Sequence, residues 1–340
     1  MDWVVRVVVV LIWGLAASVC CFGQSAGTQK PAAAPQKVII DTDIGDDVDD
    51  AFAVALALQS PELKIVGITS AWGDTKLRAR LLDRFLQETG RTDIPVAIGI
   101  EKHHPREAAF SQARWAEAGP AAKTHPAAVD FLLEQIRRQP GEITLVAIAP
   151  LTNIGAAIDR DLPTFRKLKR VVMMGGSVYR GYDDPEDGAK NSPDREYNIA
   201  MDVQAAQKLL HSGVPLYVMP LDATQLKLDE AKRELVFTQS TPLTDALALL
   251  YLQWSRATHL QTPTMFDPMA VAYAIAPELC PTKPLRIVVD DEGYTQLEPG
   301  PPNAEVCLQS DPAKFFAFFL SRLIKPNQRV ENGQGAKGAE

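Results

Sequence analysis

The stretch KVIIDTDIGDDVDDAFAVALAL (37–58) decides the fold of this 340-residue chain. It begins with a β-branched run, KVII (37–40), that is typical of a buried strand, and it ends with an apolar helical pattern, DDAFAVALAL (49–58). Between them, DTDIGDDVDD (41–50) carries six aspartates and no lysine or arginine. The stretch therefore predicts a strand, an acidic loop and a helix, which begin a βαβ unit.

The same alternation of strand and helix continues along the chain. Further strands are predicted at 64–70, 95–99, 143–149, 170–176, 215–219 and 285–289, and helices at 76–89, 127–138, 153–160, 203–211, 243–257, 268–275 and 313–323. This order predicts a single α/β domain with a mostly parallel, mixed central sheet flanked by helices. In such sheets ligands bind beyond the carboxyl ends of the strands, where the acidic loop lies.

Composition excludes some classes of protein. Hydrophobic residues make up 46% and charged residues 23%, which excludes a mostly disordered or fibrous chain. The formal net charge of -7 argues against a nucleic-acid-binding protein, which normally has a basic face. We therefore expect no nucleic-acid partner.

The two ends of the chain differ in composition from its centre. Residues 1–23 have an apolar core followed by small residues, which predicts a signal peptide, with a membrane anchor as the alternative. An Ala/Pro-rich tether (24–36), the folded domain (37–325) and a disordered tail (326–340) follow. We expect an exported protein, periplasmic or secreted, with no stable membrane insertion after cleavage.

Two cysteines, Cys280 and Cys307, remain after such cleavage. In an oxidising compartment they could form a disulfide, but two buried thiols fit the sequence equally well.

The acidic loop predicts a metal site. Carboxylates this close repel one another by several kcal/mol unless a cation lies between them. Oxygen ligands at this density favour Ca²⁺ or Mg²⁺. The loop does not follow the EF-hand pattern, because Gly45 and Phe52 occupy ligand positions. A solvated acidic turn, in which Asp49 caps the helix, is the alternative.

Two families have a strand that runs into D-x-D. The phosphatases with an aspartate nucleophile also need a basic residue and a second acidic motif, which we cannot place. The nucleoside hydrolases fit better, because the chain resembles them in six blocks that follow in order: 37–58, GITSAWGDT (67–75), APLTNIGAA (149–157), VVMMGGSV (171–178), EYNIAMDVQAA (196–206) and FDPMAVAY (266–273).

The resemblance implies the positions of the metal and of the reacting water. It implies Ca²⁺ held by Asp43, Asp50, the backbone carbonyl of Thr152, and Asp267. Asp43 would be the general base, and Asp49 would hydrogen-bond to water or ribose. Asp41 would support the ligands from behind.

It also implies a small-molecule partner, a nucleoside substrate, and the contacts to it. Glu196, Asn198 and the strand end at Met174 would hold the sugar, with further substrate contacts at Asp47 and Asp74. In other settings these residues would be ordinary core, cap or surface positions. Only their joint order favours the functional interpretation.

The chain departs from the family pattern at three places. Two extra residues precede the aspartate pair, so Asp49 and Asp50 match it best, although Asp47 could replace one of them. Asp74 stands where the family usually has asparagine. Phe266 stands where many purine-cleaving members have a histidine that protonates the leaving base, which phenylalanine cannot do.

Three explanations of Phe266 remain: another acid acts, the base leaves by aromatic stacking, or the activity is weak or altered. His259 is the candidate acid, and Trp72 and Trp254 are, with Phe266, the candidate contacts to the base. Two functions therefore stay open. The first is an N-ribosyl hydrolase that releases free base and ribose. The second is a Ca²⁺-bound nucleoside- or ribose-binding protein with weak or lost activity. The resemblance also implies a homo-oligomer, either a dimer or a tetramer.

Overall fold

The structure, a computed structural model, describes residues 34–119, 121–183 and 189–324. The predicted signal peptide, the tether up to residue 33 and the predicted tail lie outside the described residues. Within the part described, no helix combines the length and the apolar character needed to cross a membrane.

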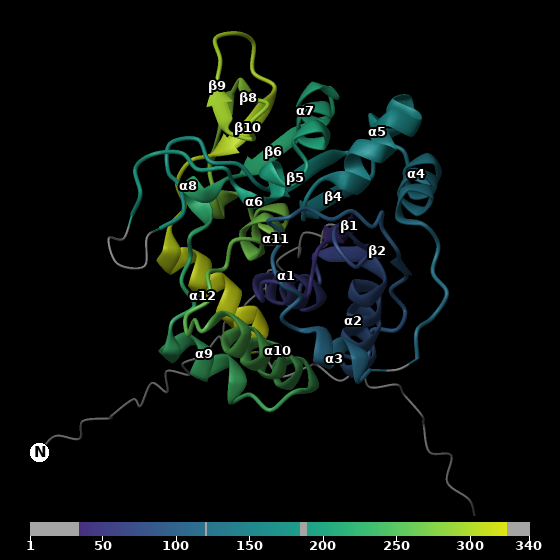
Figure 1. Cartoon of the computed structure of the whole chain (residues 1–340), viewed down its shortest axis with the longest axis vertical. Coiled ribbons are helices and arrows are strands. Elements are labelled where there is room, and N and C mark those ends of the chain that lie inside the picture. Colours follow the sequence, from purple (N-terminus) through teal and green to yellow (C-terminus); the bar gives the residue numbers. More distant parts are fainter. Residues whose placement is uncertain (1–33, 120, 184–188, 325–340) are drawn as a thin grey trace, which may run out of the picture. The chain divides into compact units, whose positions relative to one another are not determined.

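An eight-stranded sheet forms the centre of the domain (Figure 1). Its order is β3-β2-β1-β4-β5-β6-β10-β7, and only β7 runs antiparallel to its neighbour. The strands are β1 (Gln36–Thr42), β2 (Leu63–Ser70), β3 (Val96–Ala97), β4 (Ile143–Ile148), β5 (Arg170–Met174), β6 (Leu216–Met219), β7 (Thr282–Leu285) and β10 (Ala304–Cys307). A separate antiparallel pair consists of β8 (Ile287–Val289) and β9 (Thr295–Leu297). The α/β prediction with a mostly parallel sheet is confirmed.

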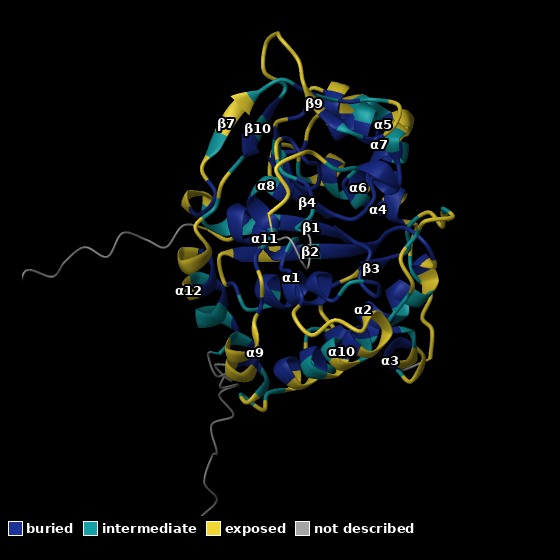
Figure 2. Cartoon of the chain, turned by 60° about the vertical axis from the view of Figure 1, so that its left-hand side comes forward, coloured by how far each residue is buried: buried dark blue, intermediate teal, exposed yellow. Residues whose placement is uncertain are grey.

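Helices cover both faces of this sheet, and its central strands are buried (Figure 2). One face packs against α1 (Asp49–Leu58), α2 (Thr75–Glu88) and α11 (Pro268–Ile275). Outside these helices, α10 (Pro242–Thr258) packs on α1 and α2, and α12 (Pro312–Leu323) packs on α1 and α11. The other face packs against α4 (Ala128–Arg138), α5 (Thr152–Phe165) and α7 (Val203–His211). Shorter helices are α3 (Ala113–Glu117), α6 (Tyr197–Ala200), α8 (Leu221–Thr224), α9 (Glu230–Phe237) and the 3₁₀ turn η1 (Pro277–Leu279).

The alternation of side chains along β1 sets the geometry of the acidic loop. Val38 and Ile40 join the core on the α1 side, and Ile39 joins the core on the α5 side. The next two residues keep this period. Asp41 accepts a hydrogen bond from Asn153 at the start of α5, whereas Thr42 donates to Asp50 at the start of α1.

The strand order reverses between β1 and β4. From β1 the chain proceeds outward through β2 and β3, and from β4 it proceeds in the opposite direction through β5 and β6. Such a reversal opens a crevice at the carboxyl edge, because the two connections leave in opposite directions. The loop after β1 lies at this crevice.

The carboxyl-terminal part of the sheet differs from the prediction. The strand expected at 285–289 is two strands: β7 pairs with β10, and β8 pairs with β9. Asn303 lies at the break, since its side chain accepts from the Ile287 N–H and donates to the Ile287 carbonyl. β10 itself was not predicted, because it is short and follows the Pro-rich run EPGPPN (298–303).

Cys280 and Cys307 form a disulfide, which joins the end of η1 to β10. The sequence left open whether these cysteines are paired or are two buried thiols. In the structure they are both buried and paired.

Candidate functional site

A cavity of about 150 Å³ lies at the carboxyl edge of the sheet, beside the loop after β1. Its acidic and polar lining residues are Asp43, Asp46, Asp47, Asp49, Asp50, Tyr182, Glu196, Tyr197, Asn198 and Asp267. Three apolar residues complete the lining: Ala108, Met174 and Phe266. The structure therefore brings together nine predicted site residues from four distant blocks: Asp43, Asp47, Asp49, Asp50, Met174, Glu196, Asn198, Phe266 and Asp267.

Three carboxylates form the centre of the cluster. Asp49, Asp50 and Asp267 each offer an oxygen, and these oxygens lie within 4.8 Å of one another. The Asp267 backbone N–H donates to Asp49 Oδ2 at 3.1 Å, which fixes the start of α11 against the start of α1. All three residues are buried, so the alternative of a solvated acidic turn does not fit.

Burial and mutual repulsion dominate the electrostatics of this cluster. Burial raises the pKa of Asp43 to about 8, despite the opposing effect of Arg78. Burial and the neighbouring carboxylates raise the pKa values of Asp49, Asp50 and Asp267 well above the usual range. A divalent cation among these oxygens would favour the ionised forms, and oxygen-only ligands suit a hard cation such as Ca²⁺.

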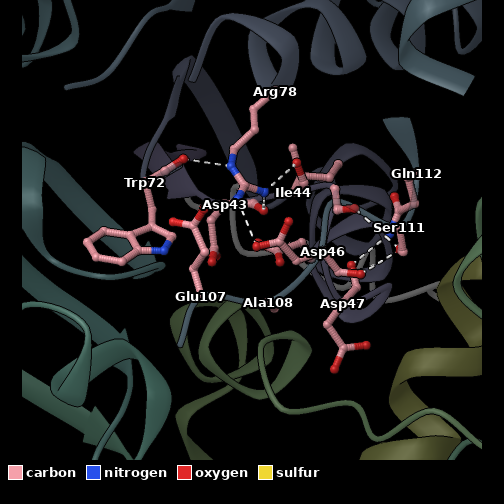
Figure 3. Close-up of polar contacts among 12 residues, drawn as sticks. Asp43, Ile44, Asp46, Asp47, Trp72, Arg78, Glu107, Ala108, Ser111 and Gln112 are labelled. Carbon is pink, nitrogen blue, oxygen red and sulfur yellow. Dashed lines mark hydrogen bonds and ion pairs between the residues drawn. The ribbon is translucent and has the colours of Figure 1, made fainter. Parts of the chain in front are cut away.

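A buried arginine that sequence reasoning missed supports the loop from behind (Figure 3). Arg78 Nη2 lies 2.7 Å from Asp46 Oδ2, and both side chains are at most 5% exposed. The same guanidinium donates to the carbonyls of Asp43, Ile44 and Trp72. The sequence signal was a basic residue on the apolar face of a predicted helix, next to Ala79 and Leu82.

A segment at 107–112 contacts Asp46 and Asp47, which lie just before the aspartate pair Asp49 and Asp50 (Figure 3). Ser111 donates to the Asp46 carbonyl at 2.6 Å, and the Gln112 side chain donates to the Asp47 carbonyl at 2.8 Å. At Gly45, where φ is +131°, a Cβ would lie 2.1 Å from the Phe110 ring. These hydrogen bonds therefore fix the backbone at Asp46 and Asp47, and position 45 requires glycine.

Glu196 and Asn198 meet the end of β5. The Glu196 carboxylate accepts from the backbone N–H groups of Gly176, Asn198 and Ile199 at 2.9–3.1 Å. Burial nevertheless raises its pKa to about 7. The Asn198 side chain donates to the Met174 carbonyl at 3.2 Å. These contacts fix a carboxylate and an amide in the wall of the cavity that the aspartates also line.

Other predicted residues lie behind or beside the cavity. Asp41 accepts from Thr69 and from Asn153, the latter at 2.8 Å, and burial raises its pKa to about 6. Thr152 begins α5 after β4, and its hydroxyl donates to Asp202 at 2.7 Å. Asp202 also caps α7, so the aspartate that ends the block EYNIAMD has a structural role.

Besides Asp41 and Thr152, four more predicted residues do not line the cavity. Asp74 is exposed and caps α2 by accepting from the Leu77 N–H, so its side chain is used by the helix. His259 is exposed and ends α10 in the left-handed conformation with φ of 61°. Trp72 and Trp254 are buried and do not line the cavity. The structure thus places these four side chains outside the cavity wall, and their contacts to the base or sugar stay predictions.

Two tyrosines that the sequence did not single out do line the cavity. Tyr182 stacks edge-on against Phe266, with ring centroids 5.9 Å apart and an interplanar angle of 85°. The Tyr197 hydroxyl accepts from the Ala108 N–H at 3.0 Å, which connects α6 to the segment 107–112. Tyr197 directly follows Glu196, but Tyr182 lies in a polar loop that offers no periodic signal.

The chain is similar to known proteins over most of its length. A model of the family described as inosine-uridine preferring nucleoside hydrolase matches residues 38–317. The pyrimidine-specific ribonucleoside hydrolase RihA of Citrobacter koseri is 30% identical over 317 residues, which cover 84% of this chain and 97% of that protein. Uridine nucleosidase 1 of Arabidopsis thaliana is 30% identical over 279 residues, with coverage of 76% and 79%.

A solved structure agrees in fold. The plant nucleoside hydrolase PpNRh1 matches with a TM-score of 0.72 at 25% identity, over 86% of this chain and 100% of that chain. Since the family match spans most of the described domain, the chain belongs to the inosine-uridine preferring nucleoside hydrolase family.

Proposed function

We propose that this ribonucleoside hydrolase cleaves the N-glycosidic bond with a water held at the acidic cluster and deprotonated by Asp43. The observation that carries the proposal is the buried cluster of Asp43, Asp49, Asp50 and Asp267 in one cavity with Glu196. These carboxylates repel one another in the absence of a cation. Asp43, Asp50 and Asp267 would hold Ca²⁺ together with the Thr152 carbonyl. When bound, the ion would lower the pKa of a coordinated water and orient ribose hydroxyls.

The other steps of the reaction are assigned to side chains of the cavity. Asp43 takes the proton from the water, whose oxygen attacks C1′ of the ribose. Asp49 accepts a hydrogen bond from the water or from a ribose hydroxyl. Glu196 and Asn198 hold the sugar from the opposite wall, in an orientation fixed by their contacts to the backbone. The electron pair of the C1′–N bond leaves with the base.

Uridine is the first substrate to test, because two relatives are named for pyrimidine or uridine cleavage. The assay measures free ribose and free base from uridine and inosine, in chelator and after Ca²⁺ is added back. Asp267→Asn should lose turnover and metal affinity, whereas Asp93→Asn, at an exposed ion pair with Arg91, should not. Tight nucleoside binding without release of ribose would instead support the nucleoside-binding protein.

The protein is further proposed to be exported and to form a dimer or tetramer. The disulfide supports an oxidising compartment, since cytosolic thiols are normally kept reduced. Exposed leucines support association through α9, α10 and the residues after them: Leu235, Leu249, Leu252 and Leu260. Fractionation of cells and light scattering of the purified protein test these two proposals.

A further inference from the structure

Phe266 leaves the departing base without an obvious hydrogen-bond donor. Its ring lines the cavity next to Asp267, where it can contact a base but cannot donate a proton. The base gains negative charge as the C1′–N bond breaks, and a donor aimed at that charge speeds the step. His259, the sequence-based candidate for this role, lies outside the cavity wall.

Tyr182 places a hydroxyl-bearing ring beside Phe266 in the cavity wall. It lines the same cavity, and its ring packs edge-on against Phe266 with centroids 5.9 Å apart. Its backbone N–H donates to Asp194 at 3.0 Å, which anchors the loop that carries it. The ring is therefore held in one orientation beside the residue that replaces the histidine.

The hydroxyl of Tyr182 has an unused proton. Its oxygen accepts a hydrogen bond from the Tyr197 N–H at 3.0 Å, which fixes the position of the oxygen. Among the described residues, no acceptor takes the proton of this hydroxyl in return. Burial, together with the nearby Glu196 carboxylate, raises the pKa of Tyr182 well above its usual value. The phenol therefore stays protonated and is a donor at neutral pH.

We propose that Tyr182 is a catalytic residue whose hydroxyl donates a hydrogen bond to the leaving nucleobase, in place of the histidine that Phe266 replaces. This inference rests on the proposed function. The base leaves with the electron pair of the C1′–N bond, and the hydrogen bond stabilises its negative charge. The base then takes up a proton from solvent, and Asp43 releases to solvent the proton that it took from the attacking water, so that the protons balance.

The test compares two substrates whose leaving groups differ in their need for a donor. Tyr182→Phe removes only the hydroxyl, so kcat for uridine should fall about 10²-fold, as for loss of one donor to developing charge. A nitrophenyl riboside has a good leaving group, and its kcat should change by less than about threefold. Tyr179→Phe is the matched control, because Tyr179 lies in the same segment but is 53% exposed. It should leave both rates unchanged.

A second variant keeps both the ring and the hydroxyl. 3-Fluorotyrosine at position 182 is a stronger hydrogen-bond donor, so the ratio of kcat for uridine to kcat for the nitrophenyl riboside should rise. An unchanged ratio would overturn the proposal. Equal losses of kcat on both substrates in Tyr182→Phe would also overturn it, because they would indicate a structural role for Tyr182. The proposed hydrolase activity would be unaffected by that result. Failure of the wild-type protein to cleave either substrate would overturn the proposed function as well.

Discussion

Replacing Arg78 with methionine should destabilise the domain more than any exposed ion-pair variant. The substitution leaves the Asp46 carboxylate buried without its partner at 2.7 Å, and it leaves three backbone carbonyls without a donor. Removing one partner of a buried ion pair costs about 3–5 kcal/mol, because the remaining charge stays uncompensated. We therefore expect the free energy of unfolding to fall by about that amount.

Urea unfolding followed by circular dichroism, at one fixed Ca²⁺ concentration, measures this loss. Arg91→Met is the control, since the Arg91–Asp93 pair is exposed and should contribute at most about 1 kcal/mol. The double variant Arg78→Met/Asp46→Asn removes the orphaned charge, so it should be more stable than Arg78→Met alone. A loss in Arg78→Met below about 1 kcal/mol would refute the reasoning.

Three further predictions concern the site and the disulfide. Asp43→Asn should fold normally but lose about 10²–10⁴-fold in kcat, because it removes the general base; near-normal turnover would show that the base lies elsewhere. In chelator, stability should fall as the pH rises from about 5 to 8, because burial raises the pKa of Glu196 to about 7 in the folded state, and ionisation therefore favours unfolding. Added Ca²⁺ should reduce this fall, and a chelated protein that gains stability over the same range would contradict it. Cys280→Ser/Cys307→Ser should lower the free energy of unfolding by about 3–4 kcal/mol in urea unfolding, because the disulfide spans 27 residues; an unchanged value would contradict that account.

The sequence predicted the sheet because the information for it is local. A β-branched run such as KVII followed by an apolar helix identifies one βα unit, and the repetition of this unit implies a parallel sheet. Sequence reasoning did not find the short strands β9 and β10 near the carboxyl end. β9 has three residues and β10 has four, and their pairing with other strands selects them rather than their own composition.

The candidate site was predicted in the parts that lie close together in the sequence. The density of aspartates at 41–50 was enough to indicate a cation, whereas Asp267 and Glu196 were placed only by the order of the family blocks. Sequence reasoning did not identify Arg78 and Tyr182, because their contacts depend on the fold. Arg78 reaches Asp46 across 32 residues, and Tyr182 meets Phe266 across a still longer separation.

The measurement that tests the central claim most directly is the release of ribose from uridine by one protein sample in three states. The sample is assayed as purified, after exhaustive chelation, and after Ca²⁺ is restored, and bound metal is determined by elemental analysis in each state. The account predicts one bound divalent cation per chain, loss of turnover with the metal, and recovery on its return. Undiminished release of ribose from metal-free protein would contradict it.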